Sequence, residues 1–203
     1  MRDAAAATAD DLNQRIAARV RTLRAGRGLS LATLAARSGV SRSMISLIER
    51  GETSPTAVVL EKLTSALGVT LPALFATAGA APAASAGPVA RRADQVEWRD
   101  PASGYLRRSV SPPDAHGLQL VEVEFPAGAR VAFENARRAA HVHQQIWVLD
   151  GTLHVTVGAA RHRLATGDCL AMQLDQPVLF HNPTRRRTRY AVAIVDHAPG
   201  RRP

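Results

Sequence analysis

The chain has 203 residues, which is long enough for two small domains with separate cores. Hydrophobic residues make up 46% and charged residues 21%, as in ordinary globular proteins, and the net charge of +9 permits contact with a polyanion without demonstrating it. The single cysteine excludes an intrachain disulfide. No run is apolar enough to span a membrane, and the acidic start lacks a signal-peptide pattern. We therefore expect a cytoplasmic protein without a membrane partner.

Apolar residues in the first third of the chain recur at helical spacing. Ile16 and Val20, for example, fall on one face of a helix. Ser54–Pro55 predicts the start of a later helix, because proline is tolerated at the first helical position. We expect residues 1–10 to be disordered and residues 11–76 to form five short helices.

Residues 30–51 have the pattern of a helix-turn-helix. Ser30 and Ser41 each provide an N-cap for a short helix, and Gly39 supplies the turn between the two. The outward residues of the second helix are short or basic. Such a surface fits the major groove of DNA and presents hydrogen-bond donors to base edges.

Many positions of this domain follow one family pattern, namely Leu23–Arg24, Gly28–Ser30, Leu34–Ala35, Ser38–Ser41, Ile45–Ser46, Ile48–Gly51, Pro55, Leu60 and Leu67–Val69. Through them the segment from Leu12 to Phe75 resembles the lambda-repressor-like DNA-binding domain of the XRE family. The resemblance implies a sequence-specific transcriptional regulator that binds a double-stranded DNA operator, with a structural ion pair between Arg24 and Glu49. Leu31 stands where phage repressors often have glutamine, which leaves the operator sequence open.

The resemblance also implies which residues contact DNA. Arg42 and Ser43 fall where the family reads bases, and the two serine caps offer hydroxyl and amide groups to phosphates. Outside this motif, Arg42 would be interpreted as a solvated arginine on an exposed helix. The expected DNA-binding residues are Ser30, Ser41, Arg42, Ser43, Ser46, Leu47 and Arg50.

The composition changes at residues 77–90, an Ala/Pro/Gly linker without large apolar residues. Beyond it apolar and polar residues alternate, as in Val121–Phe125, which is typical of strands. Asp150–Gly151 lies between two such runs and predicts a β-hairpin. We expect residues 91–198 to form an antiparallel β-barrel or sandwich.

The glycine-punctuated frame of this second domain comprises Pro126–Gly128, Val148–Gly151, Val155–Gly158, Gly167–Asp168 and Asn182–Pro183. This frame resembles the small single cupins, with their double-stranded β-helix, that are fused to XRE domains in bacterial regulators. The resemblance implies a sensor and dimerisation domain, and hence a homodimer that responds to a small-molecule effector.

The metal site of the cupin family is incomplete in this sequence. The family's glutamate position falls on Gln144, and its second-motif histidine position falls on Val178. We therefore expect no metal and no other cofactor. The alternative is a rearranged zinc site made of His141, His143 and His181.

Without a metal, the barrel is expected to hold an organic effector. The candidate pocket residues are His143, Gln144, Trp147 and Phe180. Cys169 is expected to be a small buried hydrophobe. We expect a regulator rather than an enzyme, because the sequence shows neither a complete metal site nor a placed general base. The alternatives are a metal-dependent cupin enzyme or metallosensor tethered to DNA, and a cupin that only holds two chains together.

Overall fold

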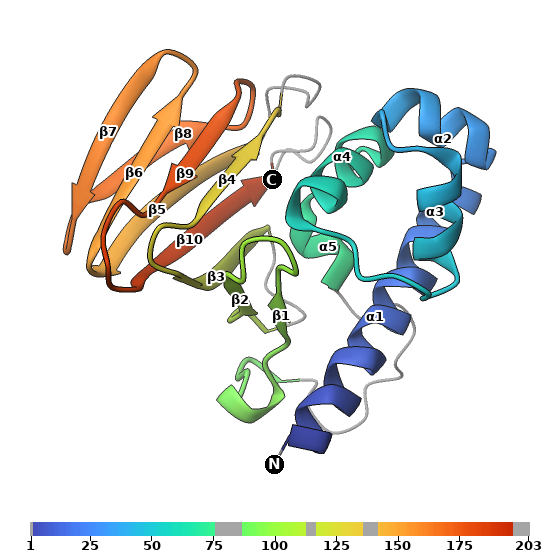
Figure 1. Cartoon of the computed structure of the whole chain (residues 1–203), viewed down its shortest axis with the longest axis horizontal. Helices are drawn as coiled ribbons and strands as arrows, with labels where there is room; N and C mark the ends of the chain where they lie inside the picture. The colour runs from blue at the N-terminus through green and yellow to red at the C-terminus, as the bar shows by residue number, and fades with distance from the viewer. Residues whose placement is uncertain (1, 76–86, 113–116, 136–141, 197–203) are drawn as a thin grey trace. The chain divides into compact units, whose positions relative to one another are not determined.

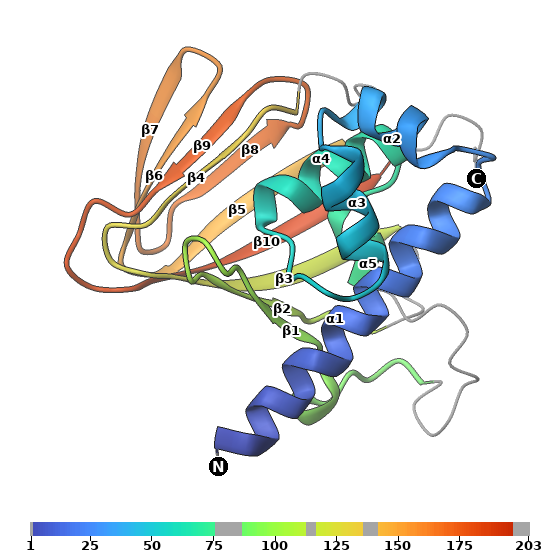
Figure 2. The same ribbon diagram turned by 45° about the vertical axis from the view of Figure 1, so that its right-hand side comes forward.

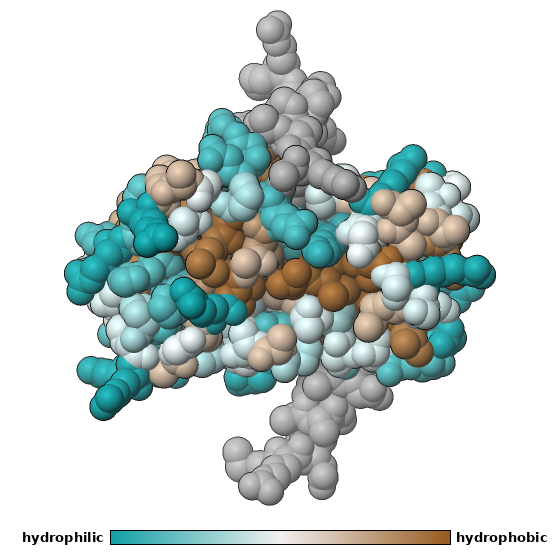
Figure 3. Space-filling view, turned by 45° about the horizontal axis from the view of Figure 1, so that its top comes forward, coloured by the Kyte–Doolittle hydropathy of each residue, from teal (hydrophilic) through white to brown (hydrophobic). Residues whose placement is uncertain are grey.

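The computed structural model describes residues 2–75, 87–112, 117–135 and 142–196, without the side chains of residues 2–10, 72, 73 and 196. The chain forms two compact units, Met1–Ala80 and Ala81–Pro203, and each is described by itself (Figure 1). Among the described helices, none is long and apolar enough to cross a membrane. Hydrophobic residues reach the surface among hydrophilic ones on the face drawn in Figure 3.

The first unit is a cluster of α-helices, in which α1 lies beside α3 and α5 (Figure 2). Its core contains the fully buried side chains of Ile16, Leu34, Ile45 and Leu60. The helix α1 begins at Arg2, where the sequence predicted disorder, because its first turns are rich in alanine, the strongest helix former. The helices are α1 (Arg2–Ala25), α2 (Leu31–Ser38), α3 (Arg42–Glu49), α4 (Ala57–Leu67) and α5 (Leu71–Phe75).

The start of α4 differs from the sequence-based expectation. The N-cap is Thr56, whose hydroxyl accepts a hydrogen bond from the Val59 amide at 3.3 Å. Pro55 precedes the cap and is buried, so it is outside the helix rather than at its first position. A threonine hydroxyl can satisfy a free amide of the first turn, which proline cannot do. Gly68 ends the helix in the left-handed conformation, as expected.

The second unit is an antiparallel β-sandwich. One sheet has the strand order β1-β2-β3-β10-β5-β8, and the other has the order β4-β9-β6-β7 (Figure 1). From β3 onward, successive strands alternate between the two sheets, except that β6 and β7 are neighbours in the four-stranded sheet. This is the jelly-roll arrangement shared by cupins. The strands are β1 (Glu97–Arg99), β2 (Leu106–Ser109), β3 (Leu118–Phe125), β4 (Arg130–Phe133), β5 (Val142–Asp150), β6 (Thr152–Val157), β7 (Ala160–Ala165), β8 (Cys169–Gln173), β9 (Val178–His181) and β10 (Thr188–Asp196).

The predicted hairpin at Asp150–Gly151 is wrong. The strand β5 pairs with β10 and β8, whereas β6 pairs with β7 and β9, so this turn carries the chain from one sheet to the other. Gly151 has φ +91°, and an added Cβ would lie 2.9 Å from Thr188 Oγ1. Its amide donates to Thr166 Oγ1 at 3.0 Å. The close approach of β10, rather than a tight hairpin, therefore requires this glycine.

The strands β1, β2 and β4 were not predicted from the sequence. The strand β2 contains two arginines, Arg107 and Arg108, so it lacks the alternation of apolar and polar residues. Arg108 is held by ion pairs with Glu97 and Glu122. Arg107 is buried, which lowers its pKa to about 10, so the guanidinium remains charged at neutral pH. Pairing with β3 orders this strand, and pairing is a tertiary property that its own sequence does not reveal.

Candidate nucleic-acid interface

The helices α2 and α3 are joined by a short turn with well-defined caps. The Ser30 hydroxyl accepts from the Thr33 amide at 3.0 Å, and the Ser41 hydroxyl accepts from the Met44 amide at 3.2 Å. Gly39 ends α2 at φ +69°, in the left-handed region that favours glycine. These local contacts set the angle at which the chain enters α3, as in a helix-turn-helix.

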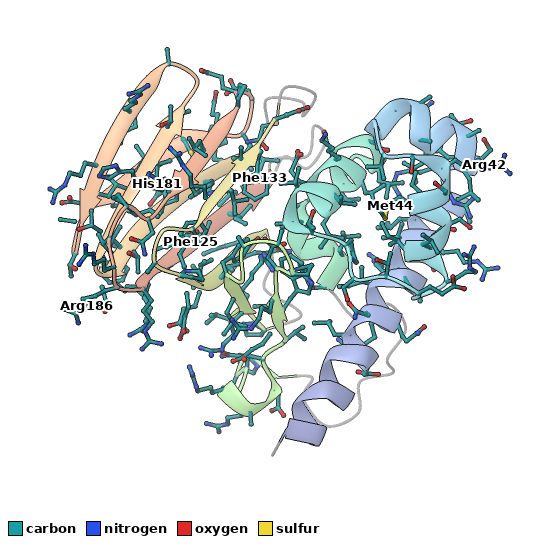
Figure 4. All side chains as sticks on the ribbon, in the orientation of Figure 1. Arg42, Met44, Phe125, Phe133, His181 and Arg186 are labelled. Carbon is teal, nitrogen blue, oxygen red and sulfur yellow. The ribbon has the colours of Figure 1, made fainter. Side chains whose placement is uncertain are left out.

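The two faces of α3 differ sharply. Ile45 and Ile48 are buried against the other helices and anchor α3. Arg42, Ser43 and Met44 are exposed at its N-terminal end, which is the end that a recognition helix presents to base edges. Figure 4 shows Arg42 at the outer edge of the helical unit. Met44 was not among the expected DNA contacts, although it directly follows Ser43, which was.

An ion pair between α1 and α3 fixes the orientation of the recognition helix. Arg24 donates from Nε and Nη2 to the two carboxylate oxygens of Glu49, at 2.7 and 2.8 Å. Its Nη1 donates to the Leu29 carbonyl at 2.8 Å. Hydrogen bonding to Glu49 raises the pKa of Arg24. The expected structural pair is thus confirmed, and it also holds the segment that leads into α2.

The remaining expected contacts are partly engaged within the protein. Arg50 binds both oxygens of Glu52, with its Nε 2.6 Å from Oε1, and also contacts the Ser46 hydroxyl. Ser46 and Leu47 are half-buried, so they present less surface than Arg42. The hydroxyls of Ser30 and Ser41 accept in their caps and lie 2.8 and 3.1 Å from the hydroxyls of Thr33 and Ser43. The amides of the first helical turn are further donors suited to phosphates.

Glu52, which holds Arg50, was not predicted from the sequence. We expect Glu52→Gln to tighten binding to double-stranded DNA several-fold at low salt, because it removes a negative charge and releases a guanidinium for phosphates. Affinity measured over a range of salt concentrations checks this, since an added phosphate contact steepens the salt dependence. Asp94→Asn, which removes the same charge from an exposed residue of the β-unit, is the control. Equal effects of the two variants on DNA affinity would show that the change comes from net charge alone and not from the release of Arg50.

The expected effector residues do not share one side of the β-sandwich. On β5, Gln144 and Ile146 are buried, whereas His143 and Trp147 are exposed on the opposite side of the strand. Phe180 lies inside and stacks on Tyr190 with 6.2 Å between ring centroids. A common pocket for all four residues is therefore wrong, because neighbouring residues of a strand point to opposite faces. Gln144 and Phe180 remain as interior candidates.

The alternative zinc site is not assembled by the described residues. His143 is on the outer side of one sheet, and His181 is on the outer side of the other, where its ring lies 6.0 Å from that of His154. These two histidines therefore cannot share an ion. His141 lies outside the described residues. Within the described ranges, no group of three or more His, Cys, Asp or Glu residues is arranged to hold a metal.

Cys169 is also placed differently from expectation. It is exposed at the start of β8, with its Sγ 4.0 Å from Gln145 Oε1. Its neighbours in sequence are apolar, but alternation along the strand directs Leu170 and Met172 inward and Cys169 outward. The thiol is thus accessible on the outer side of the six-stranded sheet.

Comparison with known proteins agrees with this geometry. Residues 20–74 match the HTH_3 helix-turn-helix family. A curated relative, the HTH-type transcriptional regulator SutR of Escherichia coli K12, is 26% identical over 174 residues, which cover 85% of this chain and 90% of SutR. The crystal structure of an HTH_3 family transcriptional regulator from Vibrio cholerae has 24% identity and a TM-score of 0.73, and the match covers 93% of this chain and 99% of that one.

The fold and the exposed α3 surface define a class of protein, the helix-turn-helix transcriptional regulators that carry a cupin-like β-domain. Within this class, the N-terminal unit carries an XRE-type helix-turn-helix, since residues 20–74 match the HTH_3 model.

Proposed function

We propose that this regulator binds its operator as a homodimer, with one α3 helix of each chain in the major groove. Arg42 and Ser43 read base edges there, while the N-terminal turns of α2 and α3 fix the register on phosphates. Two chains related by a twofold axis match half-sites about 34 Å apart. The observation that carries this proposal is the exposed, short and basic N-terminal end of α3 above the buried Ile45 and Ile48.

We expect Arg42→Ala to weaken binding to the preferred duplex by about 1–3 kcal/mol, that is, roughly 5- to 150-fold. The arginine donates two hydrogen bonds to a guanine edge, and alanine donates none. The duplex is first selected from a randomised library with the full wild-type chain. Affinities of the wild type and the variant are then measured on this duplex and on one with a scrambled sequence.

The control is Arg37→Ala, because Arg37 is another exposed arginine, on α2 rather than α3. This change should weaken binding to the selected and scrambled duplexes equally. Arg42→Ala should instead reduce the ratio between the two affinities. If Arg42→Ala keeps that ratio at the wild-type value, Arg42 does not read bases and the placement of α3 is wrong.

We further propose that the β-unit senses a small-molecule effector and is not catalytic. Gln144 and Phe180 are both buried in the sandwich, on strands β5 and β9 of opposite sheets, and most of the other buried side chains of this unit are apolar or aromatic. Such a combination suits an organic ligand, since a few polar groups orient it within apolar walls. An effector held there would shift operator affinity by favouring one spacing of the two helix-turn-helix domains. We place the protein in the cytoplasm, where its operator lies.

A further inference from the structure

The two sheets of the β-unit have very different outer surfaces. On the four-stranded sheet, one row of paired residues runs Arg130, His181, His154 and Arg163, and the next runs Ala132, Leu179, Thr156 and Arg161. This surface is polar and basic, as expected of a sheet that faces water on one side.

On the outer side of the six-stranded sheet, β3, β10, β5 and β8 instead carry exposed or half-buried apolar side chains. Trp147 is 53% exposed, Leu118 is 44% exposed and Leu120 is 40% exposed. We call this surface the Trp147 face. It consists of three rows of paired residues across β3, β10, β5 and β8, namely Leu118, Val195, His143 and Gln173, then Leu120, Ala193, Gln145 and Ala171, then Glu122, Ala191, Trp147 and Cys169.

The Trp147 face is of the size expected for the core of an interface. Four strands about 4.8 Å apart and three rows about 6.8 Å apart give roughly 300–400 Å² of nearly flat surface. Apolar patches of this size on folded proteins are often functional. A standard dimer buries about 800 Å² per partner, in which an apolar centre is surrounded by a polar rim. Outward residues of β2 and of the strand ends can supply that rim.

The charges on this surface favour a second copy over DNA. The three rows contain no lysine and no arginine, so they offer nothing to phosphates. Their one carboxylate, Glu122, already accepts from Arg108 at 2.6 Å and from Arg189 at 2.9 Å. A twofold axis places like residues near one another, and apart from the ion-paired Glu122 that contact would bring together mainly apolar side chains and amides. The small side chains of Ala191 and Ala193 leave room beside Trp147 for an indole from the facing copy.

We propose that the Trp147 face is the homodimer interface of this protein, formed by two copies of the six-stranded sheet packed face to face. This inference rests on the proposed function, since it names the surface through which the two DNA-binding units are held at the spacing of the half-sites. Packed sheets lie about 10 Å apart, so the two indoles interleave with the alanines of the facing copy.

The test is the self-association of the full chain by analytical ultracentrifugation over a wide concentration range. We expect the wild type to dimerise and Trp147→Glu to raise the dimer Kd by about 30-fold or more, as for a central interface tryptophan. Leu120→Glu should act in the same direction. Val89→Glu, at another exposed apolar residue, should leave Kd unchanged. Circular dichroism of each variant verifies that it is folded.

A second readout needs no disruptive variant. The fluorescence of Trp147, taken as the difference between the wild type and Trp147→Phe, should shift to shorter wavelength as dimer forms. In parallel, Cys169 should become protected from alkylation. A blue-shifted Trp147 in a monomer would mean that another part of the same chain covers the face, which overturns the proposal.

The possible failures can be told apart. If the wild type dimerises and neither Glu variant changes the dimer Kd, the proposed homodimer stands, but the Trp147 face is not its interface. A wild type that stays monomeric at all concentrations would eliminate both the interface and the dimeric part of the proposed function. Base recognition by α3 is tested separately by Arg42→Ala on the selected duplex.

Discussion

Asn182→Ala is expected to lower the free energy of unfolding of the β-unit by about 4 kcal/mol. The Asn182 side chain is fully buried, and its Nδ2 donates to the carbonyls of Phe125, Pro126 and Arg186, at 3.2, 3.0 and 2.7 Å. Its Oδ1 accepts from the amide and hydroxyl of Thr184. Alanine would leave the three carbonyls and the Thr184 amide and hydroxyl without this hydrogen-bond partner, at a site that water does not readily reach. Buried polar groups without a partner lower the free energy of unfolding.

Urea unfolding followed by tryptophan fluorescence measures this effect, because both tryptophans, Trp98 and Trp147, belong to the β-unit. The matched control is Pro183→Ala at the exposed neighbouring residue, which should change the free energy of unfolding little. A loss below about 1 kcal/mol for Asn182→Ala would show that the loop rearranges to satisfy these carbonyls, contrary to the role assigned to the amide.

Arg24→Ala is expected to lower the free energy of unfolding of the helical unit by about 3 kcal/mol. The side chain of Glu49 is only 8% exposed and that of Arg24 is 17% exposed, so removing the arginine leaves a poorly solvated carboxylate without its cation. The substitution also frees the Leu29 carbonyl. We expect weaker DNA binding as well, since α3 loses the contact that orients it against α1.

The matched control is Arg50→Ala. Arg50 also forms a two-pronged ion pair, with Glu52, but both side chains are about half exposed, so water can replace the lost partner and stability should change little. Thermal or urea unfolding followed by the helical circular dichroism signal distinguishes the two variants. Equal losses from Arg24→Ala and Arg50→Ala would contradict the view that burial makes the first pair important.

In the proposed function, the helical unit supplies DNA recognition and the β-unit supplies association and sensing. A symmetric operator would require a second copy of α3, and we propose that the Trp147 face holds that second copy. The end of α3 and the Trp147 face are expected to affect different properties of the protein. Changes at Arg42 should alter the choice of sequence, whereas changes at Trp147 should alter assembly.

The features that the sequence alone determined are those with local causes. The caps at Ser30 and Ser41 and the turn at Gly39 depend on contacts within a few residues, so the pattern of short helices was predictable. The Arg24–Glu49 pair was accessible only through family resemblance, because its partners are 25 positions apart. Disorder at the N-terminus was not found, since the alanine-rich segment extends α1 instead.

Tertiary structure decided everything that depends on strand pairing. Asp150–Gly151 has the composition of a hairpin turn, but whether β5 pairs with β6 or with β10 and β8 depends on contacts far apart in the chain. The same holds for Trp147. Alternation along β5 separates it from Gln144, but only the register with β10 and β8 places it among Ala191, Ala193 and Cys169 on an apolar surface. Local propensity sets helices and their ends, whereas hydrogen bonding between distant strands sets which side chains share a face.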